Sequence, residues 1–210
     1  SLFRKRGEVD RSIRIHQNLI ARPTLTTEQR DIAMMELGKD YLAAGFYDRA
    51  EEIFLNLVRQ EDHSEEAEDQ LIAIYQVTKD WQKAIDIIKS LKRKRQQSLK
   101  HLQAHLYCEL ADEASDSELT LKHLMQAIKQ DPKCGRAMLN AAKLYLNQQD
   151  YGRSKEMLNR LKEADIELFP EALAIAKEVY QSTDDLNAYR ELLRDALEQG
   201  AGASVAITLA

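Results

Sequence analysis

The sequence predicts an all-α protein in which antiparallel helix pairs stack into a solenoid. Residues 37–50 and 71–84 align without a gap, so that Tyr41 and Tyr75 correspond at an offset of 34 positions. A two-helix unit of this length is typical of the tetratricopeptide repeat, whose stacked copies form a binding surface. The composition agrees, with 31% charged and 44% hydrophobic residues and only three prolines. We therefore expect a tetratricopeptide repeat superhelix.

Further copies of the pattern extend over the whole chain, which we interpret as a single solenoid of residues 1–210. Tyr145 and Tyr180 mark two later copies, whereas the third has Ala111 in place of the tyrosine, 36 positions after Tyr75. Because both ends fall inside a repeat, the parent protein is expected to be longer on both sides. The expected units are a partial repeat 1–23, repeats at about 27–62, 65–98, 101–132, 135–168 and 170–200, and the start of another at 203–210.

Residue size explains the repeated positions. Ala50 and Ala84 are expected where the second helix of a pair crosses the first, because only a small side chain lets two helix axes approach closely. The repeated tyrosines are interpreted as packing residues, each with a hydroxyl that needs a partner or water. His16 falls in a packing position of the partial repeat and is interpreted as a core histidine with a hydrogen-bond partner.

Helix boundaries are marked by local signals. Thr26 and Gln29 form a candidate capping box for a helix that begins after Pro23. Gly45 and Asp80 are expected in the short turns within two repeats. Two further joints are expected at residues 131–132 and 169–170, because the residue before a proline is disfavoured in a helix.

Several classes of protein are disfavoured by the sequence. The chain has no apolar run of about 18 residues and no signal-peptide pattern, so we expect this segment to be soluble. Its two cysteines, Cys108 and Cys134, lack the spacing of a disulfide framework or a zinc ribbon, which favours a reducing cytoplasm. No nucleophile, metalloprotease or phosphate-loop motif occurs, and we expect no enzyme activity.

One candidate metal site can be formulated. His101 and His105 are one helical turn apart, and with Cys108 they could face a metal ion from one side of a helix. No fourth ligand occurs at a recognisable spacing, so we interpret the two histidines as partly exposed packing residues. We expect no metal and no cofactor in this segment.

The repeat register predicts which side chains line the concave face formed by the first helices. The central members are acidic, so we expect the groove to bind a basic or amphipathic segment of a partner. The expected partner-binding residues are Lys39, Glu66, Asp69, His105, Glu109, Asp112, Glu113, Arg136 and Lys143.

A basic patch stands out in a chain of net charge -5. It consists of Lys92, Arg93, Lys94 and Arg95. The favoured interpretation is structural, because cations near a helix carboxyl end stabilise the helix dipole. The functional alternative is contact with anionic lipid or with an acidic partner. Nucleic acid is disfavoured because no aromatic residues are interleaved with the charges.

Residues that the repeat does not require resemble a specific family. Residues 2–17, together with 38–45, 81–86 and 107–111, closely resemble the bacterial lipopolysaccharide assembly protein B family. The resemblance covers most of the chain and is strongest in the first 110 residues.

The resemblance implies a Gram-negative inner-membrane protein with an amino-terminal anchor, cytoplasmic repeats and a carboxy-terminal rubredoxin-like metal domain, of which this chain is the middle part. The family acts as an adaptor through which the membrane AAA+ protease FtsH degrades LpxC, the deacetylase that commits precursor to lipid A. Members can form homodimers through the repeats. The alternative is a structural platform that assembles lipopolysaccharide biosynthesis or transport proteins without a proteolytic role.

Overall fold

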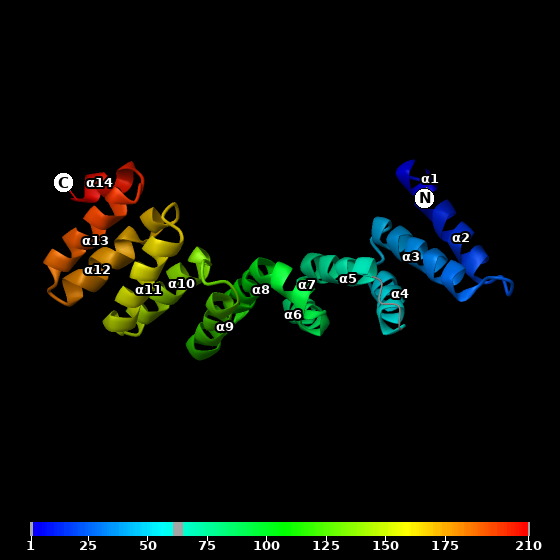
Figure 1. Cartoon of the computed structure of the whole chain (residues 1–210), viewed down its shortest axis with the longest axis horizontal. Helices are drawn as coiled ribbons and strands as arrows, with labels where there is room; N and C mark the ends of the chain where they lie inside the picture. The colour runs from blue at the N-terminus through cyan, green and yellow to red at the C-terminus, as the bar shows by residue number, and fades with distance from the viewer. Residues whose placement is uncertain (1, 61–64, 210) are drawn as a thin grey trace. The chain divides into compact units, whose positions relative to one another are not determined.

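The computed structural model describes residues 2–60 and 65–209, which form helices with no strand among them. The chain divides into two compact units, Ser1–Ser90 and Leu91–Ala210. Each unit is built from helices that pack on their neighbours in chain order, as the colour gradient of Figure 1 shows within each unit. The predicted all-α class and the stacked antiparallel helix pairs are therefore confirmed.

The first unit contains the helices that surround the candidate site. α2 packs on α3, α3 on α4, α4 on α5 and α5 on α6. The helices are α1 (Leu2–Lys5), α2 (Val9–Ile20), α3 (Thr27–Ala43), α4 (Tyr47–Arg59), α5 (Glu65–Thr78) and α6 (Trp81–Ser90). The end of the predicted repeat at 27–62 falls outside the described residues.

The second unit begins with a short helix and continues in pairs. α8 packs on α9 and α10 on α11, and α12 lies against both α10 and α13. Its elements are α7 (Arg93–Ser98), α8 (Lys100–Glu113), α9 (Ser117–Gln130), α10 (Gly135–Asn147), α11 (Tyr151–Ala164), a 3-10 turn (Phe169–Ala172), α12 (Leu173–Ser182), α13 (Leu186–Glu198) and α14 (Ala203–Leu209). One continuous superhelix over both units stays a prediction.

The capping signal at the start of α3 is confirmed, whereas Phe169, the residue before Pro170, lies inside the short 3-10 helix that precedes α12. The Thr26 hydroxyl accepts a hydrogen bond from the Gln29 backbone N–H at 3.2 Å, and the Gln29 side chain accepts one from the Thr26 N–H at 3.1 Å. This is the reciprocal capping box predicted from the two residue types. Gly45 and Asp80 lie in the turns between α3 and α4 and between α5 and α6.

The turns inside four helix pairs share a left-handed backbone conformation, and only one of the four residues that adopt it is a glycine. One residue in each takes a positive φ: Gly45 (76°), Lys79 (62°), Gln149 (60°) and Asp184 (52°). In three of these pairs the carbonyl of Tyr41, Tyr145 or Tyr180 accepts a hydrogen bond from the N–H five positions later, as from Phe46 to Tyr41 at 2.9 Å. This left-handed closure satisfies carbonyls that a helix end leaves unpaired.

The small and aromatic positions pack as expected. Ala50 and Ala84 are fully buried. Gly38 in α3 faces Phe54 in α4 so closely that an added Cβ would lie 2.6 Å from the ring. The tyrosines Tyr41, Tyr75, Tyr145 and Tyr180 are all buried.

Two buried tyrosine hydroxyls have identified partners. Tyr75 donates to Glu51 at 2.7 Å, and Tyr41 accepts a hydrogen bond from Gln17 at 2.9 Å. In three pairs a cation eight positions after the tyrosine lies over its ring: Arg49 over Tyr41, Lys83 over Tyr75 and Arg153 over Tyr145.

A polar cluster joins α1 and α2 to α3. Asp40 of α3 is fully buried and is reached by three side chains from the two preceding helices. Arg4 donates to it at 2.7 Å, Ser12 donates at 2.7 Å, and His16 Nδ1 lies 2.6 Å from its second oxygen. A buried carboxylate needs such partners. His16 is therefore a packing residue with a hydrogen-bond partner, as the sequence predicts.

Across the described residues, every helix is too short or too polar to span a bilayer.

Candidate functional site: a groove in the first unit

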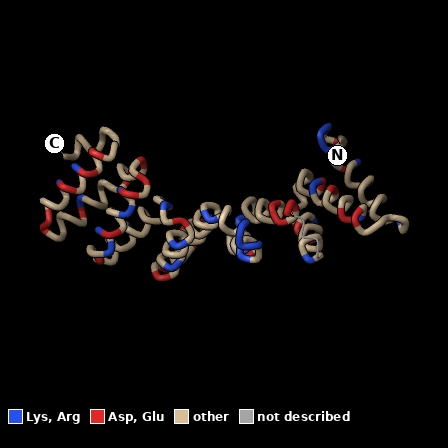
Figure 2. The backbone as a smooth tube through the Cα atoms, in the orientation of Figure 1, with Lys and Arg blue, Asp and Glu red and all other residues tan. Residues whose placement is uncertain are grey.

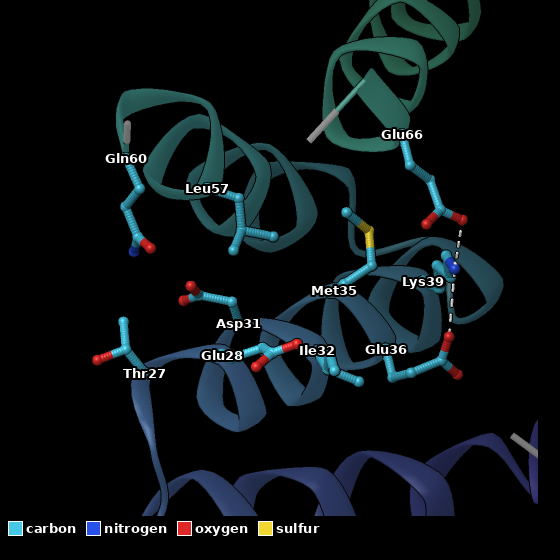
Figure 3. A pocket seen from close by; sticks show the side chains of 10 residues that line it. All are labelled: Thr27, Glu28, Asp31, Ile32, Met35, Glu36, Lys39, Leu57, Gln60 and Glu66. Atoms are coloured by element: carbon cyan, nitrogen blue, oxygen red, sulfur yellow. Dashed lines mark hydrogen bonds and ion pairs between the residues drawn. The ribbon is translucent and has the colours of Figure 1, made fainter. Parts of the chain in front are cut away.

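A groove of about 550 Å³ lies in the first unit, with most of its lining contributed by α3. α4, the residue that follows it (Gln60) and α5 supply the remainder (Figure 3). The α3 positions 28, 31, 32, 35, 36 and 39 recur at intervals of three and four, so they share one face of the helix. The lining residues are Thr27, Glu28, Asp31, Ile32, Met35, Glu36, Lys39, Leu57, Gln60 and Glu66.

The centre of the groove is apolar. Met35 and Leu57 point toward each other between α3 and α4, and both are buried (Figure 3). Ile32, one turn along α3 from Met35, is 61% exposed, which is unusual for a large aliphatic side chain beside a packed core. Covering Ile32 with a partner side chain would remove this apolar surface from water.

One end of the groove carries a chain of ion pairs between α3 and α5. Lys39 Nζ lies 2.6 Å from Glu66 Oε1 and 3.2 Å from Glu36 Oε1, and Arg4 bonds the other Glu36 oxygen at 3.0 Å. Partial burial acts to lower the pKa of Lys39, but hydrogen bonds from its ammonium to Glu66 and Glu36 outweigh it and raise the pKa. Lys39 therefore stays charged and fixes the two carboxylates in place.

The other end carries carboxylates without a cation. Within the described part of the chain, neither Glu28 nor Asp31 takes part in an ion pair. When its amide nitrogen is turned toward α3, Gln60 donates to both Asp31 oxygens at 2.9 and 3.0 Å. Two carboxylates beside an exposed isoleucine favour a partner segment with a Lys or Arg next to an apolar residue.

The structure brings together only some of the residues predicted from the register. Lys39 and Glu66 meet in this groove, and Met35 forms part of its floor. Asp69 is exposed on α5 and Lys143 is exposed on α10. The remaining predicted residues lie in the second unit, so the sequence-predicted set is divided between the two units.

The second cluster is centred on Arg136 at the start of α10. Its guanidinium donates to Glu109 at 2.6 Å and to Asp112 one turn further along α8. His105 Nε2 lies 3.6 Å from the same Glu109 carboxylate, and Glu113 is exposed at the end of α8. The cluster is acidic as predicted, but Arg136 compensates two of its carboxylates.

The structure fits the structural interpretation of the basic patch only for Arg95, which lies in the last turn of the six-residue helix α7. α6 ends at Ser90, and Lys92, Arg93, Lys94 and Arg95 stand at the start of α7, as the blue segment of α7 in Figure 2 shows. Lys92 is the N-cap of α7 and Arg93 its first residue, so these two cations lie at the positive end of the helix dipole and gain nothing from it. The helix is interrupted because Leu91 is buried and its carbonyl accepts a hydrogen bond from the Gln96 side chain at 2.7 Å. Lys92, Arg93 and Lys94 are exposed.

The residues of the candidate metal site, His101, His105 and Cys108, do not face a common point. His101 is 82% exposed and its Nδ1 lies 2.7 Å from Asp131, whereas Cys108 is fully buried. Among residues 2–60 and 65–209, no group of three His, Cys, Asp or Glu side chains is placed to hold a metal ion.

Sequence reasoning missed most of the first-unit groove. It named Lys39 and Glu66 but not Glu28, Asp31 or Ile32, although these three share the α3 face of Met35. The signal that could have found them is the spacing of carboxylates around an isoleucine in the first two turns. Leu57 of α4 and Gln60 directly after it also line the groove, and we left them out because we assumed a face lined only by first helices.

Curated relatives match the chain along its length. Lipopolysaccharide assembly protein B of Escherichia coli (strain K12) is 38% identical over 213 residues, covering 100% of this chain and 55% of the relative. The protein of the same name from Haemophilus influenzae is 34% identical over 195 residues, covering 92% of this chain and 49% of the relative. The chain therefore spans about half the length of the curated relatives it matches. The resemblance predicted from the sequence is confirmed over the whole chain.

Solved structures and family models add little. A tetratricopeptide repeat protein from Parabacteroides merdae is 13% identical and covers 97% of this chain and 78% of its own, with a TM-score of 0.48. A segment of MamA from Desulfovibrio magneticus is 14% identical, with 77% and 88% covered and a TM-score of 0.44. No family model matches the chain.

Proposed function

We propose that this chain, which resembles lipopolysaccharide assembly protein B along its whole length, serves in lipopolysaccharide assembly as a protein-binding segment without a catalytic role. The observation that carries the proposal is the 38% identity over the entire repeat region. The groove on α3, with its apolar floor and carboxylate rim, supports it by offering a surface suited to a peptide segment.

More specifically, we propose that the parent protein is an adaptor in lipopolysaccharide regulation. It would hold the lipid A pathway deacetylase LpxC beside the membrane protease FtsH, on the cytoplasmic face of the inner membrane. An adaptor of this kind raises the effective concentration of client beside protease, and so accelerates degradation without any chemistry of its own. The residues of this chain supply contacts, and the protease supplies the bond cleavage.

The groove defines the chemistry of the contact we propose. Its occupant is a segment of a partner protein with a Lys or Arg that meets Glu28 and Asp31, and an adjacent apolar side chain that covers Ile32. Charge complementarity would steer the encounter, and burial of Ile32 would slow dissociation.

A second candidate function is favoured by the name that the relatives carry, which refers to assembly. The parent protein would then organise lipopolysaccharide biosynthesis or transport proteins at the membrane without promoting proteolysis. Both functions use the same kind of binding surface, so they differ in the fate of the bound protein.

The lifetime of the deacetylase separates the two functions. In a strain lacking the full-length protein, the adaptor function predicts that the deacetylase persists after protein synthesis is stopped, because the protease no longer captures it. A deacetylase as short-lived as in the parent strain would reject the adaptor function and leave the platform.

Two groove variants of the full-length protein locate the contact. Glu28→Lys reverses a rim charge and Ile32→Ser removes exposed apolar surface, so each should lengthen the deacetylase half-life. Asp48→Lys is the matched control, because Asp48 is also an exposed acid in the first turn of its helix but does not line the groove. If both groove variants behave as the control does, partner binding lies on another surface.

A further inference from the structure

Two cysteines far apart in the sequence lie side by side in the second unit. Cys108 is in the middle of α8, and Cys134 is the residue directly before α10. Their sulfur atoms are 3.8 Å apart, although 26 positions separate them. The α8 and α9 pair and the packing of α10 on α9 bring them together. Both are free thiols.

The distance is short enough for a disulfide after a small movement. A disulfide bond is about 2.05 Å long, so the sulfurs must approach by roughly 1.8 Å. Cys108 is fully buried inside a regular helix and offers little freedom. Cys134 is only partly buried and precedes the helix, in the turn where its N–H donates to the Asp131 carbonyl at 3.0 Å. We therefore expect the Cys134 sulfur to make most of this movement.

The two thiols differ in reactivity. The hydrogen bond with Cys108 is the main reason that the pKa of Cys134 is lowered, to about 7; burial opposes the shift, whereas the Ala137 N–H and the Arg136 charge support it. The same hydrogen bond, together with burial, raises the pKa of Cys108. Cys134 is therefore the more readily ionised of the two thiols, and the thiolate is the nucleophilic form.

We propose that Cys108 and Cys134 form a redox site, which a peroxide oxidises to an intramolecular disulfide. The Cys134 thiolate attacks a peroxide oxygen, the O–O bond breaks, and hydroxide leaves and takes up a proton to become water. Cys134 is then a sulfenic acid. The Cys108 sulfur attacks the Cys134 sulfur, the S–O bond breaks, and water leaves with the Cys108 proton. Two thiols lose two electrons, and one hydrogen peroxide becomes two water molecules.

The disulfide would tie α8 to the start of α10 beside the Arg136 cluster. Arg136, two positions after Cys134, holds Glu109 and Asp112 of α8 through its guanidinium. Moving Cys134 toward α8 would therefore shift Arg136 relative to Glu109 and Asp112, the two carboxylates whose charge it partly neutralises. The bond also closes a loop in the unfolded chain, which stabilises the folded unit. The site is independent of the groove in the first unit.

The 210-residue chain is suited to the test because it contains no other cysteine. The reduced protein is treated at neutral pH with hydrogen peroxide, the probe, and its intact mass and tryptic peptides are measured. We expect a monomer lighter by two hydrogen atoms, a cross-linked peptide joining Cys108 to Cys134, and reversal by a thiol reductant. The thermal unfolding midpoint of the oxidised protein should rise.

Variants and pH separate the proposed chemistry from unspecific oxidation. Cys108→Ser should stop at a sulfenic acid on Cys134, trapped by dimedone, whereas Cys134→Ser should react no faster than an ordinary buried thiol. In the unmodified chain, iodoacetamide should label Cys134 before Cys108, with a rate midpoint at a lower pH than that of an ordinary thiol. Cross-linking between two chains, a sulfinic acid without a cross-link, or equal labelling of both cysteines would overturn the proposal. None of these readouts depends on the proposed adaptor function.

Discussion

Replacing Gly38 by alanine tests whether the crossing of α3 and α4 depends on the absence of a side chain. A Cβ built on Gly38 would lie 2.6 Å from Phe54 Cζ and 2.7 Å from Cε1. The Phe54 ring is fully buried, so it cannot swing into solvent to make room. Either the ring or the helix axis has to shift.

The expected magnitude combines two opposing effects. Alanine is better than glycine in a helix interior by about 1 kcal/mol. Overpacking a dense core costs about 1–3 kcal/mol, and two contacts well inside van der Waals distance place Gly38 in the upper part of that range. We therefore expect Gly38→Ala to lower the free energy of unfolding by about 1–2 kcal/mol.

Gly152→Ala in α11 is the matched control. Its added Cβ would have only the Asp150 carboxylate within reach, at 3.8 Å, which is ordinary contact. Here the higher helix propensity of alanine acts without a clash, so the variant should be as stable as the original or slightly more stable. The gain should be smaller than in a helix interior, because Gly152 lies in the first turn of α11.

Urea unfolding followed by far-ultraviolet circular dichroism measures both variants. A Gly38→Ala protein at least as stable as the original would refute the argument. The Phe54→Leu background then identifies the cause, because the two substitutions should be strongly non-additive if the ring is the obstacle.

Two further predictions concern the polar contacts of α3. Asp40→Asn should cost about 3 kcal/mol, because the amide cannot accept from Arg4, Ser12 and His16 as the carboxylate does; thermal unfolding measures the loss, and one below about 1 kcal/mol would show that the cluster adds little. Burial acts to raise the pKa of Glu36, but hydrogen bonds from cationic groups, Lys39 and Arg4 among them, outweigh it and lower the pKa below its ordinary 4.5. The stabilisation from Glu36 is therefore complete above that value and is lost as pH falls through the folded pKa, so that Glu36→Gln should show a flatter decline of stability in acid.

Features carried by local residue types could be read from the sequence. The period that links Tyr41 and Tyr75, the small residues Ala50 and Ala84, and the Thr26 cap each depend on a few neighbours, and the structure places all of them as predicted. Each of these signals depends on residues that are close in the sequence and recurs at the repeat period. It can therefore be recognised without knowing how the helices pack.

Features that depend on long-range contacts could not be read. The break between α6 and α7 follows from the burial of Leu91, which the run of cations after it conceals. The contact between Cys108 and Cys134 depends on how α9 folds back, and no spacing rule expresses it. The groove was found only in part, because Leu57 and Gln60 reach it from a second helix.

The cluster around Asp40 has a mechanical consequence. Apolar seams between helices yield gradually under load, because sliding exchanges one contact for a similar one. Hydrogen bonds to a single carboxylate have one register, so the bonds from Ser12 and His16 must break before α2 can slip along α3, and the bond from Arg4 must break before α1 can. A pull on α1 would therefore be transmitted to the repeats without slack until the cluster ruptures. We therefore expect α1 and α2 to move together with α3 and not independently of it.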